Sequence, residues 1–302
     1  MPRALCPVLA IAIAGLVSPV QAHGLSAPGS QGWLDWRPEI WIVAAVVVVL
    51  AAYSLGVVRL WRTAGVGRGI GMMQAVCFSI GMLLVVIALA SPLEQLAGAL
   101  LTAHMVQHVV LIVLAPLFLV LGRVEVAFAW ALPRAMRRAV ARQPGLRSIA
   151  RLFHPLVRPL PAAILHGAAV WIWHAPGLFQ AALTNPFLHD LEHASFFVTA
   201  LIFWYGTLIA MRSPSTMMAG MVGIVITLIH GGLMGALITL TPSVLYPAYS
   251  GSTEAFGLTP LEDQQLAGLI MWVPASAIYL AAGLFLAARL LEATELRARQ
   301  QR

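Results

Sequence analysis

The sequence predicts an all-α membrane protein: a polytopic helix bundle with seven transmembrane helices that follow a cleaved signal peptide. Of its 302 residues, 60% are hydrophobic and only 10% are charged, whereas soluble domains carry about 25% charged residues. The mean hydropathy of +0.88 agrees with this class. Seven apolar stretches each approach the ~20 residues that a bilayer requires. We expect the spans at residues 40–60, 70–91, 101–121, 160–175, 188–210, 217–240 and 264–288.

The N-terminal segment, MPRALCPVLAIAIAGLVSPVQAHG, has the features of a secretory signal. Arg3 gives it a positive start, its apolar core is short for a span, and VQA at 20–22 resembles a cleavage site. We therefore expect residues 1–22 to be a signal peptide and residues 23–302 to form the membrane domain. An uncleaved anchor helix is the alternative. Cleavage after Ala22 would make His23 the first residue, and its amine and imidazole together suit Cu(II).

The basic residues predict how the chain is oriented in the membrane. All eighteen are arginine, and beyond Arg37 they fall in residues 59–68 and 123–158, at position 212 and after the last span. The positive-inside rule places these segments in the cytoplasm. We expect a multi-pass protein of a bacterial inner (plasma) membrane, with its mature N-terminus outside and its C-terminus cytoplasmic. This topology accounts for the net charge of +7 without nucleic acid as a partner.

The longest of the arginine-rich segments, residues 123–159, is expected to lie on the inner leaflet. Its arginines alternate with Ala, Leu and Val at helical spacing. Such a pattern is typical of an amphipathic helix at the surface of a bilayer.

Six of the nine histidines fall in the half of the bundle that this topology places outside. They are His104, His108, His174, His189, His193 and His230. The pairs His104/His108 and His189/His193 each have i, i+4 spacing, which puts two imidazoles on one helix face with Cβ atoms ~5–6 Å apart. Each buried ring needs a polar partner where there is no water, and a shared cation would serve several rings at once. We therefore predict that these six residues bind metal.

Other donors near these histidines bear on the choice of metal. Glu192 precedes His193 and is a candidate ligand, while Met105 and Met234 follow His104 and His230 closely and carry thioethers. Only Cys77 would remain after removal of the signal peptide, so a thiolate pair is excluded. Imidazole and thioether together favour copper. Heme and zinc are the alternatives.

Three stretches carry a resemblance to a known family. They are TAHMVQHVVLIVLAPLFLVLG (102–122), WHAPGLFQAALTNPFLHDLEHASFFVTALIFW (173–204) and LEDQQLAGLIMWVP (261–274). They resemble the membrane-integral CtaG family, the assembly factors of caa-type cytochrome c oxidase. The resemblance implies a non-catalytic role in maturing a heme–copper oxidase at a copper step, with oxidase subunits or another copper chaperone as partners. It also implies that the polar motif positions are site residues: His104, His108, His174, His189, His193 and Asp263.

Two other functions stay open at the level of the sequence. HDLEH at 189–193 matches H-x-x-E-H, the inverted zinc-protease signature in which the glutamate is the catalytic base. This would make the protein a membrane metalloenzyme. Alternatively, two histidines from different spans could ligate a b-type heme.

Overall fold

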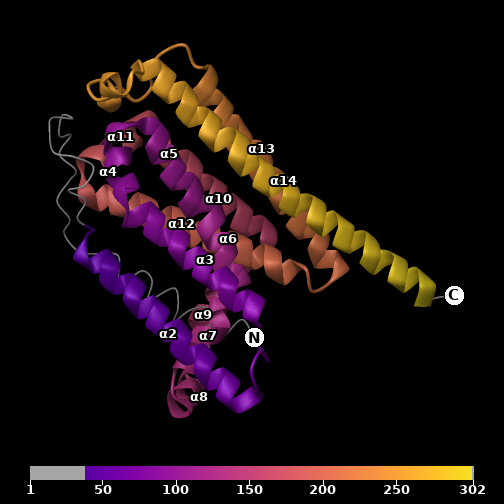
Figure 1. Cartoon of the computed structure of the whole chain (residues 1–302). Helices are drawn as coiled ribbons and strands as arrows, with labels where there is room; N and C mark the ends of the chain where they lie inside the picture. The colour runs from indigo at the N-terminus through magenta and orange to yellow at the C-terminus, as the bar shows by residue number, and fades with distance from the viewer. Residues whose placement is uncertain (1–37, 301–302) are drawn as a thin grey trace.

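The computed structural model describes residues 38–300, and within that range the chain forms helices and turns but no strand (Figure 1). The predicted signal peptide and His23 lie outside the described residues. Six helices are long and apolar enough to cross a membrane, and a bent pair, Ala150–Val157 with Pro159–Trp173, makes a seventh if it counts as one span. The all-α membrane bundle is thus confirmed. The six are α2 (Ile40–Ala64), α3 (Met72–Leu89), Leu101–Leu121, α12 (Pro186–Ala210), α13 (Pro214–Leu240) and α14 (Pro260–Gln300).

Proline and small polar residues fix where several helices begin. α4 (Pro92–Ala99), α10 (Pro159–Trp173), α11 (Pro176–Thr184), α12 and α13 all start with proline, whose missing N–H would have no partner in a first turn anyway. The side chain of Asn185 accepts hydrogen bonds from the backbone N–H groups of Phe187 and Leu188. Such a cap stabilises a helix start by about 1 kcal/mol. It fixes the beginning of α12, which carries HDLEH.

The third span is the central helix of the bundle and is not a regular α-helix. It consists of α5 (Leu101–Val109), a π-helical turn η2 (Val110–Leu114) and α6 (Ala115–Leu121). Pro116 lacks an N–H group, and its ring opposes the carbonyl of Ile112, so the chain widens at this turn. Over an 18-residue stretch of this span 72% of the residues are buried, against 22% over stretches of the same length in α2 and α3. Its polar side chains therefore face protein and not lipid.

Glycines bring the last two spans into close contact. A Cβ atom on Gly235 of α13 would lie 2.9 Å from the backbone oxygen of Gly268 on α14, and the reverse distance would be 2.8 Å. Only residues without side chains allow two helices to approach this closely in a membrane. α13 and α14 therefore pack tightly against each other along one side of the bundle (Figure 1).

At one end of the bundle, which we call the arginine end, the connections between helices contain most of the arginines. It includes α7 (Val124–Ala131), α8 (Arg134–Arg142), α9 (Pro144–Phe153) and η3 (His154–Val157). The single amphipathic helix expected here is replaced by two short ones, α8 and α9. The cause is Pro144, which holds the preceding Gln143 in an extended conformation with ψ 117°.

The opposite end, which we call the histidine end, is closed by α4, α11 and the loop of residues 241–259 (Figure 1). This loop contains η4 (Pro247–Tyr249) and η5 (Thr253–Phe256). The side chain of Gln264 accepts from Leu245 N (2.6 Å) and donates to Ser243 O (3.1 Å). Ser252 Oγ donates to Ala99 O at 2.6 Å. These bonds fix the loop above the first turns of α5.

Candidate metal centre

The first part of the site is the histidine pair on α5. The carboxylate of Asp263 accepts hydrogen bonds from the backbone N–H groups of Leu101 (2.7 Å) and Thr102 (3.0 Å), so α14 supplies the cap at the start of α5. One and two turns later come His104 and His108, which are 1% and 0% exposed. Their ring centroids lie 4.3 Å apart. The i, i+4 spacing has therefore placed both imidazoles on one buried face.

The second part comes from α12, which supplies His189, Glu192 and His193. The ring centroids of His189 and His193 are 4.2 Å apart. His193 lies 5.3 Å from His108 and 5.9 Å from His104, again between ring centroids. The two histidine pairs therefore meet across the interface between α5 and α12.

Four of these side chains could hold one ion. One ligand atom from each of His104, His108, Glu192 and His193 lies within 4.8 Å of the other three, and all four residues are buried. Both ring nitrogens of His108 and both carboxylate oxygens of Glu192 are buried without a hydrogen-bond partner. Buried polar atoms without partners are rare in folded proteins. Three imidazoles and one carboxylate fit a transition-metal ion such as copper or zinc, which would satisfy these atoms.

His174 adds a fifth donor at the edge of this four-residue group. Its ring centroid lies 5.5 Å from that of His108. Its Nδ1 is 2.8 Å from the backbone oxygen of Val170, which can only accept, so Nδ1 carries the proton. Nε2 therefore has the lone pair, and it is buried with no hydrogen-bond partner. Metal-binding histidines are commonly oriented in this way by a carbonyl group.

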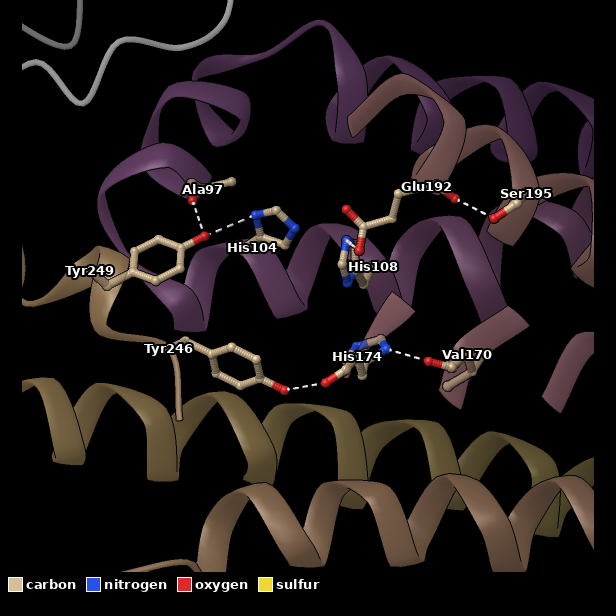
Figure 2. A network of polar contacts seen from close by, with 9 residues as sticks. All are labelled: Ala97, His104, His108, Val170, His174, Glu192, Ser195, Tyr246 and Tyr249. Atoms are coloured by element: carbon tan, nitrogen blue, oxygen red, sulfur yellow. Dashed lines mark hydrogen bonds and ion pairs between the residues drawn. The ribbon is translucent and has the colours of Figure 1, made fainter. Parts of the chain in front are cut away.

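Two tyrosines of the 241–259 loop contact these histidines, and Tyr249 orients the ring of His104 (Figure 2). The hydroxyl of Tyr249 lies 3.1 Å from both Ala97 O and His104 Nδ1. Its one proton goes to the carbonyl, so it accepts the Nδ1 proton of His104, whose lone pair is then on Nε2. Burial, helped by the negative charge of Glu192, raises the pKa of Tyr249 well above its usual value, so the phenol stays protonated. Tyr246 donates to the backbone oxygen of His174 at 2.8 Å.

The remaining predicted residues lie outside the four-residue group. His189 is adjacent to it through His193, and both oxygens of Asp263 are occupied in capping α5. Met105 and Met234 pack in the main hydrophobic core. His230 lies against Gly167 of α10 and borders a separate cavity.

Sequence reasoning missed three parts of the site. Tyr246 and Tyr249 lie in a loop without periodicity, and no pattern links Tyr249 to a histidine 145 positions away. The orientation of His174 depends on a bond to its own helix, which sequence spacing does not indicate. The π-helical turn after His108 could have been anticipated from the sequence, because Pro116 interrupts an otherwise continuous apolar span.

Comparison with known proteins gives a family and two distant relatives. The family model described as cytochrome c oxidase caa3 assembly factor (Caa3_CtaG) matches residues 51–293. Two proteins described as uncharacterized, from Mycobacterium bovis and Mycobacterium tuberculosis, are each 25% identical over 246 residues. That alignment covers 78% of this chain but only 36% of each relative, so the chain spans about a third of their length. No solved structure matches.

Proposed function

This chain belongs to the cytochrome c oxidase caa3 assembly factor family, and from that premise we propose that it handles copper for the oxidase at the group formed by His104, His108, Glu192 and His193. The observation that carries the proposal is the meeting of these four ligand atoms within 4.8 Å in a buried interface. In this role the protein holds the ion and passes it to an oxidase subunit or to another copper chaperone, without catalysing a reaction.

The donors support copper over the alternatives. Imidazole nitrogens bind copper more tightly than they bind zinc or iron in sites of equal geometry. Neighbouring ring centroids lie 4.2–5.9 Å apart among His104, His108, His189 and His193, so the rings themselves occupy the space that a porphyrin would need. In the zinc-protease reading, His189 and His193 bind metal and Glu192 is the base. Here the carboxylate of Glu192 and the ring of His193 are grouped instead with the α5 pair.

We also propose that the histidine end faces away from the cytoplasm, because the arginines gather at the other end. A reporter fused after Arg302 should then be cytoplasmic, and one inserted at Gly251 should be exported. A cytoplasmic reporter at Gly251 would overturn this orientation.

The proposed function is tested by metal analysis of the purified full-length protein. Wild type should contain copper, and the His104→Ala/His108→Ala variant should contain less copper and fail to restore oxidase activity in a deletion strain. His154→Ala is the matched control, because His154 lies in η3 at the arginine end. Equal copper in wild type and in the double variant would contradict the proposal.

A further inference from the structure

A second group of donors surrounds a cavity deeper in the bundle than the four-residue group. The cavity has a volume of about 30 Å³, enough for a water molecule or an ion. Its walls come from α5, η2, α10, α13 and α14. The polar or sulfur-bearing residues among its lining are His108, His166, Thr227, His230, Met271 and Tyr279.

The two deeper histidines each have a lone pair to offer. Thr199 Oγ1 donates its proton to the backbone oxygen of Ser195 at 2.7 Å, and it lies 3.1 Å from His166 Nδ1. Nδ1 of His166 is therefore the donor to Thr199, which leaves the lone pair on Nε2. Both ring nitrogens of His230 are buried with no hydrogen-bond partner.

Gly167 brings His230 close to His166. A Cβ atom at Gly167 would lie 2.9 Å from Nε2 of His230, so the ring of His230 rests directly on the backbone of α10, next to His166 in the chain. α14 contributes Met271, which lines the same cavity from the opposite side. Two imidazoles and a thioether thus surround a small space.

We propose that His166, His230 and Met271 form a second binding site, for a soft monovalent cation of the Cu(I) type. The residues lining this cavity include no carboxylate and no thiolate, so the donors would all be neutral. Neutral donors in a buried site favour an ion of charge +1, because burying a divalent ion without a counter-charge costs far more. Imidazole with thioether is the donor combination that suits Cu(I).

This second site is distinct from the four-residue group but continuous with it. His108 belongs to the four-residue group and also lines the cavity. An ion could therefore move from one site to the other past a single imidazole. The second site does not require the first to hold metal, because none of its three donors belongs to that group.

X-ray absorption spectroscopy at the copper edge tests the proposal, because it detects a sulfur atom bound to copper. The full-length protein in detergent is loaded with Cu(I) without oxygen, in competition with a Cu(I) chelator. Wild type should show a sulfur ligand, and Met271→Leu and His230→Leu should each lose it, together with about one equivalent of copper. Met234→Leu is the matched control, because Met234 is buried one turn from His230 but does not line the cavity.

Two glycine-to-alanine substitutions test the geometry of the site without replacing any of its three donors. In Gly167→Ala the new methyl group must displace the ring of His230, which can rotate, so the sulfur signal should fall while the protein still folds. Gly177→Ala adds the same methyl on α11, outside the cavity lining, where its Cβ would meet nothing within 4 Å, and should leave the signal unchanged.

Failure of the second site can be distinguished from failure of the four-residue group. His104→Ala/His193→Ala disables the four-residue group and should retain the copper–sulfur signal. Absence of that signal in wild type, its persistence in Met271→Leu, or its loss in His104→Ala/His193→Ala would each overturn a separate second site.

Discussion

Nε2 of His108 lies 3.9 Å from Oε1 of Glu192, and both side chains are fully buried. This separation is too long for a hydrogen bond. It is close to the spacing of two ligands bound to one tetrahedral metal ion, about 3.4 Å when each bond is about 2.1 Å. The two residues come from different spans, so an ion between them would also join α5 to α12.

Replacing Glu192 by Gln should lower the copper affinity at least tenfold and leave the fold intact. The amide keeps the shape of the side chain but loses the negative charge that favours a bound cation. Competition with a copper chelator measures the change. Unchanged affinity would show that Glu192 is not a ligand. If the protein were instead a zinc protease with Glu192 as its base, this variant would lose turnover but keep its metal.

The two histidine pairs should behave as one unit. If His104, His108 and His193 share an ion, removing either pair leaves an incomplete ligand set, so the losses of affinity in His104→Ala/His108→Ala and His189→Ala/His193→Ala should not add in the quadruple variant. Competition with a copper chelator measures these affinities. Additive losses would indicate two independent sites. Insertion into the membrane should be unaffected, because each change makes a span more apolar.

Tyr249→Phe should lower the copper affinity by about 10- to 100-fold, the usual effect of removing the partner that orients a metal-binding histidine. Without the hydroxyl, Nδ1 of His104 loses its acceptor and either nitrogen can carry the proton. Tyr246→Phe is the control, since its hydroxyl donates to the backbone oxygen of His174 and not to an imidazole ring. Equal losses in both variants would show that the loop, and not the tautomer, is what matters.

Asp263→Ala should destabilise the protein by about 2 kcal/mol or more, because it leaves two backbone N–H groups at the start of α5 without an acceptor. The midpoint of thermal unfolding in detergent should fall accordingly. Glu262→Ala removes the neighbouring carboxylate, which is exposed and bonds only locally to Thr259, and should change the midpoint little. Equal shifts in the two variants would contradict a capping role for Asp263.

Glu125 at the arginine end should make stability depend on pH. Burial raises its pKa above the usual 4.5, and the nearby Arg123 and Arg212 only partly oppose this. The folded state therefore holds this proton more tightly than the unfolded state, so its contribution is complete below pH 4.5 and is lost as the pH rises through the folded value. Glu125→Gln should remove this decline in the unfolding midpoint. A decline that persists in the variant would assign it to another group.

The spans and the histidine pairs could be predicted because both depend on local periodicity. A bilayer requires about 20 apolar residues whatever their neighbours, and a spacing of four fixes two side chains on one helix face. The sequence alone therefore predicts that His104 stands beside His108, and His189 beside His193.

What could not be predicted depends on rotation and on distant contacts. Periodicity does not say which way a helix turns about its axis, and for α13 this rotation decides that His230 faces Gly167 and not the four-residue group. Asp263 was a candidate ligand by its motif, but its partners are backbone groups of α5, 162 positions away in the chain. No residue-type rule separates a capping carboxylate from a ligating one.

The number of residues in the π-helical turn Val110–Leu114 determines how α5 is rotated relative to α6. Each residue of an α-helix advances about 100° around its axis, and a π turn holds one residue more than an α turn. Deleting one residue here would restore a regular helix, with α6 still packed by Leu119 against Gly81 of α3. His104 and His108 would then be turned about a quarter of a revolution away from α12. A change of one residue in length, with no histidine replaced, would dismantle the meeting of the two spans.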